Sequence, residues 1–189
     1  MSAGERRDNY QIMFERTRAS FLKYDQEKMI ERFQLNADER YLYLTFVARP
    51  YRIERATGAM EYWKDENPRA ERVATESAAG VWLPAGHGDG MTIYDILCDS
   101  KPDARVSGRF QNAWNQRKVS SAPNGSLFQS SADFFSGKCA LLSAACERLG
   151  GERVSTGDVG FDIPVFNEIK MRMLFWDADD EFPASMNLQ

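Results

Sequence analysis

The chain has 189 residues, of which 43% are hydrophobic and 28% are charged, and its net charge is −4 at pH 7. This composition is typical of a globular protein, and the length predicts a single domain over residues 1–189 that folds without disulfides or a structural metal. A net negative charge without a long basic patch argues against binding to nucleic acid or to anionic lipid.

The cysteines and the start of the chain indicate a compartment. Cys98, Cys139 and Cys146 show no C-x-x-C spacing, which argues against a disulfide framework and against a zinc or iron–sulfur site. The chain opens on a polar stretch instead of an apolar leader, and no apolar run is long enough to cross a bilayer. We therefore expect a cytoplasmic protein with no membrane contact, in which the three cysteines are buried small side chains.

The first third of the sequence changes from a helical to an extended pattern. Apolar side chains recur at three- and four-residue steps over residues 5–34, which predicts two helices or one bent helix, with Asp25 capping the second. Aromatic and β-branched side chains, or an alternation of apolar with charged ones, then predict a three-stranded antiparallel meander. Its strands are expected over residues 41–47, 51–55 and 60–63.

The rest of the sequence alternates between loops, helices and strands. Residues 84–90 hold three glycines and a proline, which predicts a loop, and Thr92 is expected to cap the helix that follows. The clearest helical pattern covers residues 131–149 and ends at Gly150, a typical residue for the position after a helix. Extended patterns predict strands over residues 105–110, 159–163 and 169–176, and a weaker helical pattern covers residues 71–77.

The order of these elements indicates the fold class. Helices, a meander, and then alternating helices and strands place most strands beside their neighbours in the sequence. Such an order is typical of an α+β fold with a mostly antiparallel sheet and helices packed on one face.

His87 is the only histidine, and Asp89 follows it in the glycine-rich segment. A carboxylate beside a histidine fixes the tautomer of the imidazole and raises its basicity, so this pair is suited to an oriented base or to half of a metal site. The alternative is an exposed loop histidine without a chemical role.

A second group of polar residues follows the last predicted strand. Four carboxylates, those of Asp177, Asp179, Asp180 and Glu181, lie between Trp176 and Phe182. Crowded carboxylates raise one another's pKa or attract a divalent cation. The spacing of a calcium-binding loop is absent, so we assign no metal site. The alternative is a solvated loop at the end of a strand.

The C-terminal third resembles a known family. The segments that carry the resemblance are Leu149-Gly150-Gly151, Gly157-Asp158 and, above all, the stretch from Trp176 to Ser185. They resemble the bacterial and archaeal family called domain of unknown function 3786, with its signature W-x-x-D-[DE]-E-F-P-x-S. The resemblance implies no particular activity, although some members are joined to an iron–sulfur domain of the kind found in corrinoid-linked methyl-transfer proteins of anaerobes. Members usually continue past the signature into a further strand and helix, so the resemblance implies that this chain, ending at Gln189, is a short or trimmed member.

The sequence supports two functional hypotheses. The first is a non-catalytic module that binds a protein or a small molecule through residues 176–185 and the segment 84–90. The second is an enzyme in which Asp158, Asp180 or Glu181 acts as an acid or base, with or without a divalent ion. In a purely structural subunit the same carboxylates would instead accept hydrogen bonds from backbone amides. No nucleotide-binding or cofactor motif is present, so we assign no cofactor.

Overall fold

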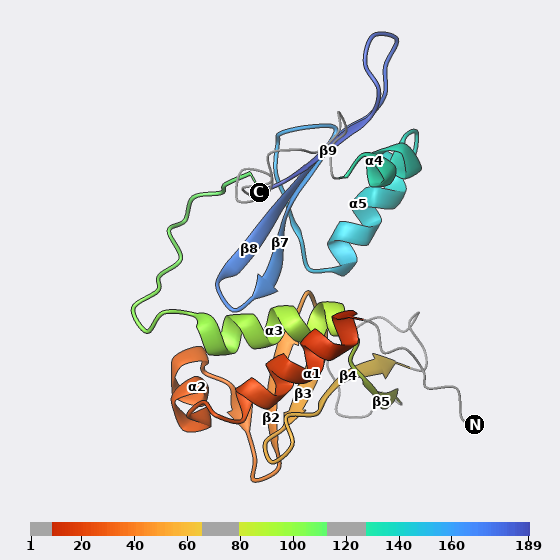
Figure 1. The fold of residues 1–189 in the computed structure, drawn as a ribbon. Coiled ribbons are helices and arrows are strands. Elements are labelled where there is room, and N and C mark those ends of the chain that lie inside the picture. The colour runs from red at the N-terminus through yellow and green to blue at the C-terminus, as the bar shows by residue number, and fades with distance from the viewer. Residues whose placement is uncertain (1–8, 66–79, 113–127) are drawn as a thin grey trace, which may run out of the picture. The chain divides into compact units, whose positions relative to one another are not determined.

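The computed structural model describes residues 9–65, 80–112 and 128–189, and Figure 1 shows their helices and strands. Residues 1–104 and 105–189 form two compact units. Each unit combines helices with an antiparallel sheet, which confirms the α+β class. The single domain stays a prediction, because a division into units does not show whether they unfold together. No helix among the described residues is both long enough and apolar enough to span a membrane.

The first unit contains the helices α1 (Asn9–Phe21), α2 (Gln26–Phe33) and α3 (His87–Asp99). The two helices expected before residue 34 are therefore confirmed. The predicted cap is also present, because the carboxylate of Asp25 accepts a hydrogen bond from the backbone N–H of Lys28 at 3.2 Å. This bond satisfies one of the amides that a helix leaves unpaired at its start.

Helix α3 begins earlier than the sequence predicts. Residues 84–90 were expected to form a loop ending at a Thr92 cap, but the helix starts at His87 and Thr92 lies inside it. One of these glycines serves packing, because a Cβ at Gly90 would lie 2.3 Å from Cε2 of Phe14. Helices α1 and α3 lie side by side (Figure 1), so Gly90 permits their close approach.

The sheet of the first unit has five antiparallel strands in sequence order. The predicted meander is confirmed and is extended by one strand at each edge. The two-residue connection between β2 and β3, Val47 and Ala48, has φ angles of +46° and +58°, as in the type I′ turns that match the twist of a hairpin. The predicted helix over residues 71–77 lies outside the described residues. The strands are β1 (Asn36–Ala37), β2 (Tyr41–Phe46), β3 (Arg49–Glu54), β4 (Met60–Asp65) and β5 (Gly80–Pro84).

The core of the first unit lies between α1, α3 and one face of this sheet. The ring of Tyr94 is fully buried, with centroids 6.0 Å from Phe14 and 5.4 Å from Phe21. Its hydroxyl donates a hydrogen bond to the carbonyl of Gly58, the residue that turns the chain before β4. The tyrosine thus joins two helices to the sheet. The buried residues on this sheet face are Leu42, Leu44, Tyr51, Ile53 and Met60.

The second unit holds two helices and a four-stranded antiparallel sheet in the order β6-β7-β8-β9. The strands expected over residues 159–163 and 169–176 are confirmed, whereas residues 105–110 form no strand. Instead, the ring of Phe110 lies 4.0 Å from the guanidinium carbon of Arg172. This is a contact between side chains and does not require the backbone hydrogen bonds of a strand. The elements are α4 (Gln129–Phe135), α5 (Cys139–Arg148), β6 (Glu152–Arg153), β7 (Val159–Phe166), β8 (Ile169–Trp176) and β9 (Ser185–Leu188).

The prediction of one helix over residues 131–149 is wrong. Helix α4 ends at Phe135 and α5 begins at Cys139, because Gly137 between them has a φ of +70°. A residue in this left-handed conformation interrupts the helical ladder. The predicted end of the helix is correct, since the amides of Gly150 and Gly151 donate to the carbonyls of Glu147 and Cys146, the pattern of a Schellman motif.

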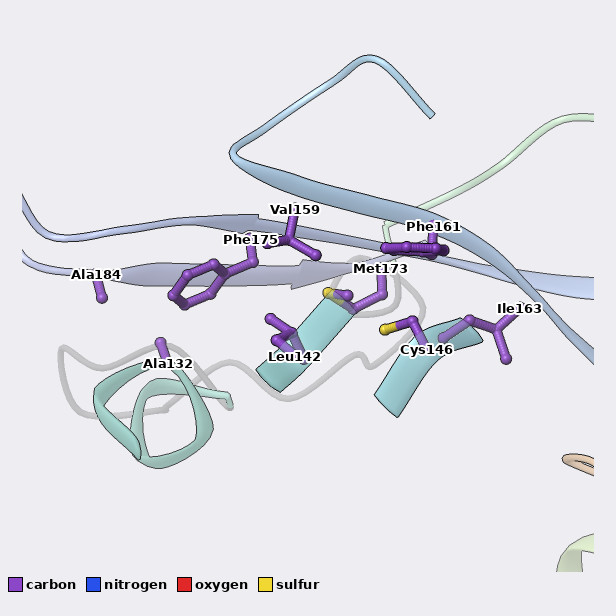
Figure 2. Close-up of a cluster of buried hydrophobic side chains, with 9 residues drawn as sticks. All are labelled: Ala132, Leu142, Cys146, Val159, Phe161, Ile163, Met173, Phe175 and Ala184. Atoms are coloured by element: carbon purple, nitrogen blue, oxygen red, sulfur yellow. The ribbon is translucent and has the colours of Figure 1, made fainter. Parts of the chain in front are cut away.

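Both helices cover one face of the second sheet, as expected for this fold class. Alternate residues of β7 and β8 point toward the helices, and Figure 2 shows Phe161, Met173 and Phe175 facing Leu142 and Cys146. Because this face is buried and the strand period is two, the register of the sheet is strongly specified. The complete cluster is Ala132, Leu142, Cys146, Val159, Phe161, Ile163, Met173, Phe175 and Ala184.

Candidate functional site

The acidic segment is the connection between β8 and β9. Trp176, the last residue of β8, pairs with Ser185, the first residue of β9, so residues 177–184 form a loop closed by the sheet. Figure 1 shows this loop extending beyond the ends of both strands. We call residues 177–184 the acidic loop.

Asp177 fixes the base of the acidic loop to the break between α4 and α5. Its carboxylate accepts hydrogen bonds from the Gly137 amide at 2.9 Å, from the Ser136 hydroxyl at 3.0 Å and from the Ala178 amide at 2.8 Å. The hydrogen bond from the Gly137 amide lowers the pKa of Asp177 most, followed by the one from the Ala178 amide. The Ser136 hydroxyl acts in the same direction. Asp177 is therefore held as a carboxylate ion, a state suited to anchoring amides and unsuited to donating a proton.

Asp158, one of the residues named in the enzyme hypothesis, lies beside Asp177. However, its carboxylate accepts a hydrogen bond from the Asp177 amide at 2.8 Å, and its own amide donates to the carbonyl of Phe175 at 2.9 Å. Gly157 permits this approach, because its φ is +81° and a Cβ would lie 2.7 Å from the Phe175 carbonyl oxygen. Asp158 thus caps the end of β8 and holds the first residue of the acidic loop.

Asp179 shapes the tip of the acidic loop. Its carboxylate accepts hydrogen bonds from the amides of Glu181 at 2.9 Å and Phe182 at 2.7 Å, and its own amide donates to the Phe182 carbonyl at 3.0 Å. The Phe182 and Glu181 amides lower the pKa of Asp179. This local turn is a usual role of aspartate in loops.

Apart from the buried Ala184, the remaining side chains of the acidic loop face solvent. Asp180 and Glu181 are exposed, and no side-chain hydrogen bond or ion pair to either appears among the described residues. Phe182 is 66% exposed and Trp176 is 39% exposed. The loop therefore presents one phenyl ring beside two carboxylates, whereas Asp158, Asp177 and Asp179 are occupied by backbone amides.

Cys139 is a neighbour of this site that the sequence did not indicate. Its thiol donates to the Asp177 carboxylate at 3.5 Å, and desolvation, followed by this hydrogen bond, raises the pKa of Cys139. A raised pKa favours the protonated thiol over the nucleophilic thiolate. The expected burial of all three cysteines is correct only for Cys146, because Cys98 and Cys139 are half-buried.

His87 and Asp89 lie in the first unit and do not form the expected pair. His87 is exposed and stacks on Tyr10, with ring centroids 5.4 Å apart. Asp89 instead accepts a hydrogen bond from the Tyr51 hydroxyl at 2.7 Å and lies 3.8 Å from the Arg49 guanidinium. Burial, then the Asp89 bond, raises the pKa of Tyr51 to about 12, so Tyr51 remains a neutral donor. Both residues thus have packing partners near the start of α3.

The ionised state of Asp177 leads to a pH-dependent stability. Its pKa is lower in the folded protein than the ordinary value of about 4. Its stabilising effect is therefore complete above about pH 4 and is lost as the pH falls through the folded-state pKa. We expect the thermal midpoint of the Asp177→Asn variant to fall less steeply than that of the wild type between about pH 5 and pH 2.

The matched control for that experiment is Asp180→Asn, because Asp180 belongs to the same loop and holds no amide. This control should follow the wild-type pH profile, as measured by circular dichroism. Equal pH slopes for Asp177→Asn and the wild type would show that Asp177 does not anchor the loop.

Across residues 9–65, 80–112 and 128–189, no three His, Cys, Asp or Glu side chains are grouped so that they could hold a metal ion.

The sequence did not reveal that Ser136 and Gly137 anchor the acidic loop, because about 40 residues separate them from Asp177. A glycine inside a helical pattern, followed by lysine, was the available signal that the helix is interrupted there.

Comparison with known proteins places this loop within a described family model. Neither the curated proteins nor the solved structures gave a match to the chain. Residues 122–189 match the model described as Domain of unknown function (DUF3786), which confirms the resemblance over this C-terminal part of the chain.

Proposed function

We propose that the chain is a non-catalytic binding module that contacts a protein partner through the acidic loop. The observation that supports this most directly is the use of three carboxylates, those of Asp158, Asp177 and Asp179, as acceptors for backbone amides. These bonds give the loop a defined shape before a partner binds. A preformed loop loses less conformational entropy on binding than a flexible one.

The chemistry of the loop tip indicates the kind of partner. Phe182 is the most exposed large hydrophobic side chain among those described, and it directly follows Asp180 and Glu181. A partner suited to this tip has an apolar pocket for the phenyl ring and Lys or Arg side chains at the rim of the pocket. The ring would supply most of the affinity, while the charges would increase the association rate and the selectivity.

The family resemblance suggests a cellular context for the module. Because some relatives are joined to iron–sulfur domains of corrinoid-linked proteins, the proposed partner belongs to anaerobic iron–sulfur or corrinoid metabolism. In this view the module is an accessory to such a protein and carries no reaction itself.

A comparative binding experiment tests the proposal. The full chain, the Phe182→Ser variant and the Glu181→Lys variant are immobilised and exposed to lysate of the native host, and proteins retained only by the wild type are purified and titrated by calorimetry. We expect Phe182→Ser to weaken binding by tenfold or more, and Glu181→Lys to weaken binding mainly at low salt.

The control is Leu141→Ser, which removes an exposed apolar side chain of α5 in the same unit. It should bind as the wild type does. If the loop variants retain the same proteins with the same affinity as the wild type, the acidic loop is not the contact surface.

A further inference from the structure

A second surface lies on the open face of the five-stranded sheet in the first unit. The register pairs Tyr43 with Arg52 and Trp63 with Trp82, so these side chains project from the face opposite the buried one. All of them are half-buried and none belongs to the core. We call this set the aromatic strip: Tyr41, Tyr43, Arg52, Trp63 and Trp82.

The members of the aromatic strip touch one another in an unbroken row. The rings of Tyr43 and Tyr41 are 6.0 Å apart, and those of Trp82 and Trp63 are 5.3 Å apart. Arg52 joins the two pairs, because its guanidinium carbon lies 4.3 Å from the Tyr41 ring and 4.5 Å from the Trp82 ring. These cation–π contacts hold the rings in place before any ligand arrives.

Trp63 lies against the sheet because Gly80, on the neighbouring strand β5, has no side chain. A Cβ at Gly80 would lie 2.3 Å from Cζ2 of Trp63, so only glycine allows the indole to rest on the backbone there. The indole N–H donates to the Asp65 carboxylate at 2.7 Å. The ring is therefore fixed at one end of the strip.

The helices of the first unit pack against the other face of the sheet. Tyr51 alternates with Arg52 along β3, and its hydroxyl bonds to Asp89 of α3. Tyr94 of the same helix is buried against Phe14 and Phe21. Within residues 9–65 and 80–104, these contacts place α3 opposite the aromatic strip.

The charges around the strip leave an acidic excess. Arg52 pairs with Glu61 at 2.6 Å, which neutralises the cation of the row. Asp38 accepts a hydrogen bond from the Tyr43 hydroxyl at 2.7 Å, and Asp65 accepts one from Trp63. Neither Asp38 nor Asp65 takes part in an ion pair with another described residue, although Arg55 donates to the backbone carbonyl of Asp38. Arg40, which stacks on Tyr41, is paired with Glu54. The Asp38 and Asp65 carboxylates therefore leave a negative charge at the ends of the strip.

We propose that the aromatic strip docks a proline-rich segment of a partner protein that carries arginine or lysine at its ends. Proline-rich segments dock on aromatic side chains as a polyproline II helix, which is already ordered and loses little entropy on binding. Trp, Tyr and Arg are also the residues most enriched among binding hot spots. The terminal cations of the ligand match Asp38 and Asp65, whereas the phosphates of a nucleic acid would be repelled there.

The geometry sets the length of the ligand. The row extends from β2 to β5, which is three strand spacings of about 4.8 Å each. A polyproline II helix rises about 3.1 Å per residue, so about five residues cross the strip. This site belongs to the first unit and is independent of the acidic loop.

Fluorescence anisotropy with labelled peptides and the full chain tests the proposal. The probe is a peptide of about ten residues, a run of prolines with arginine at each end, and the controls replace the arginines by glutamate or the prolines by Gly-Ser repeats. We expect the arginine-flanked proline peptide to bind best, and Trp82→Leu to weaken it by on the order of tenfold. Arg52→Lys, which keeps the charge but loses the planar stacking, should weaken it as well.

Two further measurements keep the test decisive. Circular dichroism confirms that each variant is folded, and Tyr41→Leu replaces Trp82→Leu if the latter unfolds. Phe182→Ser should bind the peptide as the wild type does, which separates this surface from the acidic loop. Absence of peptide binding, equal binding by the strip variants, or tighter binding of an oligothymidine or a cellulose oligosaccharide of similar length would each overturn the proposal.

Discussion

Replacement of Phe175 by alanine should lower the free energy of unfolding by about 3–5 kcal/mol. The side chain is fully buried near the C-terminal end of β8 and belongs to the cluster drawn in Figure 2. Its loss removes apolar burial and leaves a cavity between the sheet and the helices, because surrounding side chains relax only in part. Urea denaturation followed by far-UV circular dichroism measures the change.

The control for this prediction is Phe182→Ala, which removes the same ring from an exposed position. Its effect should stay within about 0.5 kcal/mol. A change of less than about 1 kcal/mol for Phe175→Ala would mean that the ring is not packed as described.

The Tyr94→Ala variant should be destabilised by a similar amount, about 3–5 kcal/mol, in the first unit. Tyr94 fills the space between α1 and the sheet and also donates its hydroxyl to the Gly58 carbonyl. Tyr94→Phe keeps the ring and loses only the hydrogen bond, so its cost should be smaller, about 1–2 kcal/mol. Equal effects of the two substitutions would show that the ring contributes little to packing.

The Phe175 and Tyr94 variants together test whether residues 1–189 behave as one domain. If the two units unfold cooperatively, either substitution shifts one transition that all spectroscopic probes share. If the units unfold separately, each substitution shifts only the transition of its own unit. Intrinsic fluorescence and calorimetry on the same samples distinguish the two outcomes.

The sequence predicted strands β2, β3, β4, β7 and β8 because their signal is local, although it wrongly predicted a strand over residues 105–110. Alternation in residues 51–55 and 159–163 reflects one buried and one exposed face, and both segments are strands. The errors occur where tertiary packing outweighs a local rule. The glycines predict a loop over residues 84–90, but Gly90 lies inside α3 and packs against Phe14.

The candidate sites were less predictable than the fold. The carboxylates around Asp177 were identified, but their role depends on the amide of Gly137, which is distant in the sequence. The two-residue spacing of Tyr41 and Tyr43 indicates that they share a face, yet only the pairing of β5 brings Trp82 to the same row. Side-chain neighbours that come from separate strands are not visible in a local pattern.

The turn formed by Val47 and Ala48 fixes the register of the hairpin between β2 and β3. Both residues adopt left-handed backbone angles that are unfavourable for them, and Val47 is β-branched, which makes the conformation rarer still. The hairpin keeps this tight connection nonetheless, and so Phe46 faces Arg49 and Tyr43 faces Arg52. Insertion of one residue that moved the pairing by a single step would turn the tyrosines of β2 toward the helices and the leucines toward water. The two-residue turn between β2 and β3 therefore determines which side chains of β2 a binding partner would contact.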